Sequence, residues 1–331
     1  MRIISTNSHS LRVPVRYFYS ILTLFCIAVL GTLLPCRAMA VEAFTQTLDV
    51  QLRADDRSSQ DLRYQYRARY YADYQFTQAW SAHTFVVTGD SFGSSHNTFD
   101  DNSADYIYVR RIYARHEGDY GKTEVGILPT YKGRVSSSGL SKDGWIKGLR
   151  HVRDMNGNKL EFVVGQLDSL DARDALSGIG KLDYFEAEYS ARLNELLSYE
   201  LSFERMTQAN FVRTELRFDL ADSSTLFTEV VTRVNNSKLK FVLGVDGAFD
   251  IGGYPLDYFA HYSFVSSKFG LRAELTEDFL GSGNGISSEI SGNVATSFAR
   301  VLQAQDVDWF VRFDKVNSQT RLMAGIKWSF Q

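Results

Sequence analysis

The sequence predicts an all-β fold, a transmembrane antiparallel up-and-down β-barrel, on three observations. Long segments alternate apolar and polar residues with a period of two, the spacing that places side chains on opposite faces of a strand. The clearest segment runs for about 15 residues, beyond the roughly 5–6 typical of strands in soluble sheets. Connectors of two sizes separate the segments, and this arrangement is typical of a barrel with two unlike rims.

The composition excludes several other classes of protein. The chain has 331 residues, 44% hydrophobic and 23% charged, so it is neither disordered nor collagen-like. It carries 36 basic and 39 acidic side chains, for a formal charge of -3. This balance provides no net positive field to hold phosphate, so we expect no nucleic-acid partner.

The first forty residues are predicted to be a signal peptide, and residues 41–331 the barrel domain. Three arginines precede an uncharged apolar run of 14 residues at 21–34, and Ala38 and Ala40 occupy the -3 and -1 positions of a cleavage site before Val41. The run is shorter than the roughly 20 residues that a helix needs to span a bilayer, although a retained anchor stays an alternative. Cleavage removes four arginines and both cysteines, which leaves 32 basic against 39 acidic side chains, a charge of -7, and no disulfide.

Six segments show the alternation most clearly. In the longest, the even positions from Leu62 to Phe76 are mostly aromatic or aliphatic, and the odd positions are mostly charged or polar. One face of each strand is therefore apolar and the other hydrophilic. In chain order the segments are Phe44–Arg53, Leu62–Phe76, Leu197–Glu204, Val212–Leu220, Val307–Asp314 and Arg321–Phe330.

The connectors complete the expected architecture. Tight turns are expected at 77–78, 155–158, 192–195 and 221–224, and longer polar loops at 54–61, 91–104, 167–180 and 278–287. We count about 17 strand-like runs, but a barrel whose two termini lie on one side needs an even number. Glycines blur the boundaries within 241–269, so we predict 16 strands, with 14 and 18 as alternatives.

A water-soluble sandwich is the main alternative fold. It also alternates, but its strands are short and its apolar faces meet in one core. Here the apolar faces are too many and too long to bury against each other without two very large sheets. In lipid, closure into a barrel pairs every backbone group and leaves no edge, so the barrel is favoured.

One segment resembles a known family. Val109–Gly126, VRRIYARHEGDYGKTEVG, resembles the fourth strand, turn and fifth strand of Gram-negative porins, and the C-terminal IKWSF resembles their last strand. The sequence departs from the family at Gln331, because these proteins usually end on the aromatic residue. The resemblance implies a water-filled channel in the outer membrane of a Gram-negative bacterium, commonly a homotrimer, in contact with lipid and lipopolysaccharide.

The resemblance also implies a third loop folded into the lumen, here at about 127–145. In many family members this loop is acidic and faces arginines on the wall. This sequence departs, since the loop carries Lys132, Arg134 and Lys142 against Asp143 alone. A loop in the lumen sets the field that an ion meets at the narrowest point, so these four residues are candidate constriction residues.

Wall residues follow from the alternation itself. Arg63, Arg67 and Arg69 share one face of their strand, and the apolar face opposite requires lipid, so the arginines are expected in the lumen. Arg111 and Arg150 join them by resemblance. Guanidinium groups facing water favour anions, which predicts a weak anion preference. A second arc of the wall is expected to carry Glu200, Glu204, Glu215 and Asp219, with a field across the lumen.

The expected function is passive diffusion of small hydrophilic solutes and ions, without catalysis or cofactor. A channel selective for sugars or organic anions stays an alternative, as does a barrel enzyme or adhesin with a filled lumen. None of the mature chain's histidines lies in a motif that pairs it with a local serine or acid, and no cysteine or zinc motif is present. The acidic residues within 100–105 have oxygen ligands for calcium, but a solvated loop is the favoured interpretation.

Overall fold

The protein is described here by a computed structural model, which covers residues 44–89, 96–99, 107–129, 145–167, 176–206, 208–220, 223–269, 282–297 and 307–331. The predicted signal peptide lies outside these residues. The strands are β1 (Phe44–Arg57), β2 (Gln60–Gln75), β3 (Trp80–Thr88), β4 (Asn97–Thr98), β5 (Ile107–Gly118), β6 (Gly121–Pro129), β7 (Trp145–Met155), β8 (Asn158–Gln166), β9 (Tyr184–Arg192), β10 (Leu197–Met206), β11 (Ala209–Asp219), β12 (Ser224–Arg233), β13 (Lys238–Ile251), β14 (Tyr254–Val265), β15 (Gly283–Asn293), β16 (Val307–Val316) and β17 (Gln319–Phe330). A 3-10 turn η2 (Val234–Asn236) and a one-turn helix α3 (Val294–Ser297) complete the described elements.

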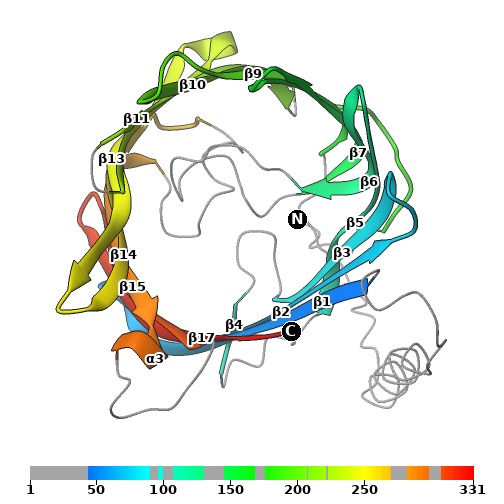
Figure 1. Cartoon of the computed structure of the whole chain (residues 1–331). Helices are drawn as coiled ribbons and strands as arrows, with labels where there is room; N and C mark the ends of the chain where they lie inside the picture. The colour runs from blue at the N-terminus through cyan, green and yellow to red at the C-terminus, as the bar shows by residue number, and fades with distance from the viewer. Residues whose placement is uncertain are drawn as a thin grey trace, which may run out of the picture. The chain divides into compact units, whose positions relative to one another are not determined.

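The strands form a closed antiparallel barrel, which Figure 1 shows as a ring. Closure is made by β1 and β17, which pair from Leu48 opposite Phe330 to Arg57 opposite Arg321. Sixteen long strands make the ring, and the two-residue β4 adds a short pairing with β2. The predicted fold class and strand number are therefore confirmed. The doubtful stretch at 241–269 contains β13, a tight turn and β14.

The connections differ between the two rims. The chain termini share one rim, here called the terminal rim, and all four predicted tight turns lie there. The opposite rim, here called the loop rim, has the connections at 89–106, 130–144, 167–183 and 266–282, although tight turns lie there as well. The prediction of a long loop at 54–61 is wrong. Strand β1 continues to Arg57 and β2 begins at Gln60, because the alternation extends through Asp55 and Arg57 to a two-residue turn.

The outer face of the barrel is apolar and exposed. Leu62 and Tyr64 of β2 are 49% and 60% exposed, and Leu322 of β17 is 50% exposed. Exposed apolar side chains recur at the outward positions around the ring, and a continuous exposed surface of this kind is typical of contact with lipid. The predicted orientation of the two faces is thus the observed one.

The inner face is less uniformly polar than the alternation suggests. Toward the loop rim, inward positions from β6 to β14 are apolar and buried, and they form one cluster that includes Leu128, Ile146, Val163, Phe211 and Val265. Charged side chains occupy the inward positions farther along the same strands. The lumen wall therefore has an apolar sector and a charged sector.

Gly126 has a local reason for being glycine. It lies on β6 opposite Tyr113 with φ +135°, and a Cβ there would press on the carbonyl oxygen of Ile112. Only glycine adopts this conformation without strain. The segment that resembles porins thus occupies the fourth and fifth long strands, as the resemblance implied. Among the described residues, no helix has the length and apolar character needed to cross a membrane.

Candidate functional site

The inner wall carries two groups of charged side chains, on opposite sides of the lumen. The first, here called the arginine arc, consists of Arg53 and Arg57 (β1), Arg63, Arg67 and Arg69 (β2), Arg110 and Arg111 (β5), Arg312 (β16) and Arg321 (β17). The second, here called the glutamate arc, consists of Glu186 and Glu188 (β9), Glu200 and Glu204 (β10), Glu215 (β11) and Glu229 (β12). These residues are placed on the lumen side by strand register.

The three arginines of β2 face the lumen opposite polar partners on β1. Arg63 is paired with Asp55, Arg67 with Gln51 and Arg69 with Asp49. The guanidinium nitrogens of Arg63 and Arg69 lie 2.6 and 3.0 Å from the carboxylates opposite. Their side chains still keep 27% and 23% of their surface exposed. The row is therefore open to solvent, and its charge is partly balanced.

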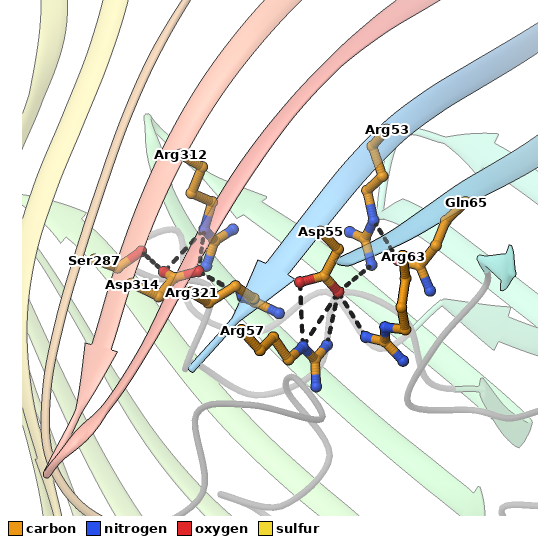
Figure 2. Close-up of polar contacts among 9 residues, drawn as sticks. All are labelled: Arg53, Asp55, Arg57, Arg63, Gln65, Ser287, Arg312, Asp314 and Arg321. Carbon is orange, nitrogen blue, oxygen red and sulfur yellow. Dashed lines mark hydrogen bonds and ion pairs between the residues drawn. The ribbon is translucent and has the colours of Figure 1, made fainter. Parts of the chain in front are cut away.

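Two buried carboxylates organise the rest of the arginine arc, as Figure 2 shows. Asp55 accepts from Arg57 at 3.0 Å and from Arg63 at 2.6 Å. Asp314 accepts from Arg312 at 3.0 Å and from Arg321 at 2.6 Å, and Ser287 also donates to it. Both carboxylates are fully buried, so each needs these donors to offset its desolvation.

A β-bulge places two adjacent arginines in the arginine arc. The register between β3 and β5 shifts by one residue between Phe85 and Val86, which lets Arg110 and Arg111 both turn inward. Arg110 is 1% exposed, and the Arg111 guanidinium lies 4.8 Å from the ring of Phe85. Strict alternation would place only one of these arginines in the lumen.

Arg150 lies on a different arc and is sealed from solvent. On β7 it points inward opposite Val163 and donates to Glu124 at 3.1 Å, and its Nε lies 3.0 Å from Glu161. Its side chain is 4% exposed. This pairing stabilises the wall and leaves little of the charge for a solute.

The glutamate arc surrounds one fully buried arginine, Arg213 of β11. Arg213 contacts four carboxylates, those of Glu188 at 3.4 Å, Glu200 at 3.1 Å, Glu229 at 2.6 Å and Glu215. Lys240 of β13 lies 3.8 Å from Glu229 and is also buried. Glu186 and Glu204 accept from Tyr184 and Ser202. The structure thus brings Glu200, Glu204 and Glu215 together, whereas the predicted Asp219 pairs with Arg192 at 2.9 Å near the terminal rim.

The two arcs face each other across the ring. Strand β1, at the centre of the arginine arc, and β10, in the glutamate arc, are separated by equal numbers of long strands in both directions. Figure 1 places β1, β2 and β17 at the bottom of the ring and β9, β10 and β11 at the top. Opposite charges on opposite walls create a field perpendicular to the barrel axis, which orients a dipolar molecule in the lumen.

A histidine joins the arginine arc from outside the long strands. His96 precedes β4, and its Nε2 lies 3.1 Å from the Gln51 side-chain oxygen. Desolvation, together with Arg67 and Arg53 nearby, holds the pKa of His96 well below its usual value. The imidazole is therefore neutral at physiological pH and adds no charge to the arc.

Several predicted residues lie outside the described residues. These are the loop candidates Lys132, Arg134, Lys142 and Asp143, and the acidic residues within 100–105 that were considered for calcium. In the part of the chain that the structure describes, no group of three or more histidine, cysteine, aspartate or glutamate side chains is arranged to hold a metal ion.

Comparison with known proteins identifies the fold class. No family model matches the chain, and no curated protein matches it by sequence. A multiply substituted mutant of the Rh. blastica porin superposes with a TM-score of 0.59 and 10% identity over 87% of this chain and 100% of that one. A triple mutant of the Rhodopseudomonas blastica porin gives 0.59 and 11% with the same coverage. The chain therefore has the barrel fold of the porins.

Proposed function

We propose that this protein is an outer-membrane porin of a Gram-negative bacterium, a water-filled channel for passive diffusion of small hydrophilic solutes and ions with a weak anion preference. The closed barrel with an apolar outer face supports the channel. One difference between the arcs supports the preference. The side chains of Arg63 and Arg69 are about one-quarter exposed, whereas those of Glu215 and Glu229 are fully buried. Between the two facing arcs, a solute therefore meets exposed arginine on one side and buried glutamate on the other.

Reconstitution in a planar bilayer under a salt gradient tests this proposal. The expected result is ohmic conductance. The zero-current potential should have the sign that indicates a modest anion selectivity. Replacing Arg63, Arg67 and Arg69 by glutamine removes the exposed row, so the potential is expected to move toward zero or to the cation side. Arg153→Gln with Arg205→Gln is the matched control, because both arginines are exposed at outward register positions. A cation-selective wild-type channel contradicts the anion preference, and an absence of conductance contradicts the porin function.

A substrate-selective channel is the second candidate, because aromatic side chains gather beside the arginine arc. Tyr71 and Phe85 stack with ring centroids 4.5 Å apart, and Arg111 lies over the same Phe85 ring. Aromatic faces with adjacent guanidinium groups suit sugars and organic anions. Saturable block of the single-channel current by a disaccharide or a dicarboxylate supports this candidate, and a current that ignores both supports general diffusion.

We further propose that the channel is a homotrimer whose outer wall also contacts lipid and lipopolysaccharide. Three polar side chains, His116, Thr123 and His151, follow one another across β5, β6 and β7 at outward positions. Thr123 and His151 bond each other at 2.9 Å. This run of polar side chains lies near the terminal rim on an otherwise apolar outer wall, and such a patch suits contact with a protein partner. Light scattering in detergent gives the subunit number, and a monomer contradicts the proposal.

A further inference from the structure

Three side chains near the terminal rim form a hydrogen-bonded chain on the inner wall. His83 of β3 is directly opposite Asp73 of β2, and Ser81 precedes His83 by two residues on the same face. The Nδ1 of His83 lies 2.5 Å from the Asp73 carboxylate. The Nε2 of His83 lies 2.8 Å from the Ser81 hydroxyl oxygen. Asp73, His83 and Ser81 are here called the Ser81 cluster.

The partner of each ring nitrogen determines which nitrogen of the His83 imidazole carries the proton. A carboxylate beside Nδ1 accepts a hydrogen bond from the Nδ1–H group, which leaves Nε2 as the nitrogen that accepts a hydrogen bond. The Ser81 hydroxyl then donates to Nε2. This is the arrangement in which a histidine acts as general base for a serine nucleophile, with the carboxylate holding the tautomer. The ring of Tyr113 stacks on His83 at 4.8 Å and 17°, which fixes the plane of the imidazole.

His83 and Asp73 are open to the lumen, Ser81 itself is 7% exposed, and Arg115 is a cationic neighbour of the Ser81 cluster. The side chains of His83 and Asp73 are 15% and 50% exposed on the lumen side. Arg115 of β5 is opposite Ser81 in register, and its guanidinium is held 2.8 Å from Glu124. The backbone N–H groups of the strands are hydrogen-bonded within the sheet. A side-chain donor such as Arg115 would therefore stabilise the oxyanion that forms on the ester's carbonyl oxygen when Ser81 attacks.

The hydrogen bond between His151 and Thr123 differs from the Ser81 cluster in its position on the barrel. Its Nδ1 bonds the Thr123 hydroxyl at 2.9 Å, but both side chains are at outward register positions. A solute in the lumen does not reach them. The Ser81 cluster combines a hydroxyl, a histidine and a carboxylate in sequence on the lumen side, where His83 and Asp73 are open to a solute and Ser81 keeps a small exposed surface.

We propose that Ser81 is an activated nucleophile that takes the acyl group of short carboxylic esters diffusing in the lumen. Ser81 Oγ bonds to the acyl carbon while its proton passes to His83 Nε2 and then to the departing alcohol. Water, deprotonated by His83, cleaves the acyl-serine to a carboxylic acid and restores the serine. Ser81 and His83 are catalytic residues, and Asp73 is a positioning residue. The activity is independent of ion selectivity and requires only that the lumen admits the ester.

Acylation is tested on the mature protein in detergent micelles with p-nitrophenyl acetate and a fluorophosphonate probe. The expected result is a burst of nitrophenolate of about one equivalent per chain, and attachment of the probe to Ser81 as located by peptide mass spectrometry. Ser81→Ala is expected to abolish both. His83→Asn is expected to slow acylation by about 10²–10⁴-fold, the usual range for loss of a general base.

The controls separate chemistry from folding. Ser198→Ala removes an inward-facing serine from β10 and is expected to keep the full burst. Heat modifiability on gels and unchanged conductance establish that each variant is folded. If Asp73 orients the histidine, Asp73→Glu retains more of the acylation rate than Asp73→Asn. Hydrolysis that persists in Ser81→Ala, or a probe attached to another residue, overturns the proposal. A conducting channel without a burst overturns it too and leaves the porin function standing.

Discussion

The arginine arc and the glutamate arc use the same kinds of side chain in opposite ways. In the glutamate arc four of the six carboxylates converge on a fully buried Arg213, so those charges face one another. In the arginine arc, Asp55 and Asp314 are the buried ions, and the Arg63 and Arg69 side chains extend past their carboxylate partners into solvent. The difference shows that the count of charges on a channel wall does not predict its field, because burial decides which charges a solute meets.

The largest expected effect follows from removing the central cation of the glutamate arc. Arg213→Met leaves its four glutamates buried without that partner, and breaking a buried ion pair typically costs about 3–5 kcal/mol. We expect a clear fall in the urea midpoint of unfolding, measured by tryptophan fluorescence. Arg192→Met is the control, because the side chain of Arg192 is 59% exposed and pairs at 2.9 Å with Asp219, whose side chain is 42% exposed. Equal losses in the two variants would contradict the contrast between a sealed network and a solvated pair.

A charge reversal in the arginine arc tests the other half of the comparison. Arg67→Glu places an acid between Arg63 and Arg69 on the exposed row of β2. We expect the zero-current potential to move toward cation selectivity, with little change in stability because this side chain is partly exposed. Glu215→Gln, in the buried glutamate arc, is the matched change and should alter selectivity less. The opposite ranking would show that the glutamates reach the conducting path.

A smaller effect of opposite sign is expected from removing one acid of the arginine arc. Asp49 accepts from Arg69 at 3.0 Å and is 11% exposed. Asp49→Asn releases the Arg69 charge to solvent while keeping the side-chain volume, so the anion preference should rise slightly. The measurement is again the zero-current potential. An unchanged potential would place Arg69 away from the narrow part of the channel.

The smallest expected effect concerns pH. Because the pKa of His96 is lowered in the folded protein, the unfolded chain takes up a proton more readily as the pH falls below about 6.5. Stability is therefore lost on the acid side, by less than about 2 kcal/mol at pH 5 for one group. His96→Gln should reduce the fall in the urea midpoint between pH 7 and pH 5. His116→Gln, on the outer face beside Trp80, is the control and should leave that fall unchanged.

The alternation of the sequence predicted many of the residues on the inner wall of the barrel, but not all of them. The period of two assigned Arg63, Arg67, Arg69, Glu200 and Glu215 to one face of their strands, because side-chain direction depends only on the neighbouring backbone. Polar residues on both faces around Asp55 and Arg57 suggested a loop, but strand β1 continues with the same alternation through both residues. The inward pair Arg110 and Arg111 was beyond reach, since a bulge depends on how two strands match each other.

By itself the sequence determined the barrel and its lipid-facing and lumen-facing sides, whereas the choice of 16 strands over 14 or 18 was settled by the structure. The barrel and its two sides follow from strand periodicity and from the need to pair every backbone group in lipid. Tertiary structure decided which residues meet across strands: Asp73 with His83, Arg213 with glutamates from four strands, and one arc opposite the other. The register between strands and the closure of the barrel set those distances, and burial set which charges a solute meets. The sequence of a single strand predicts neither the distances nor the burial.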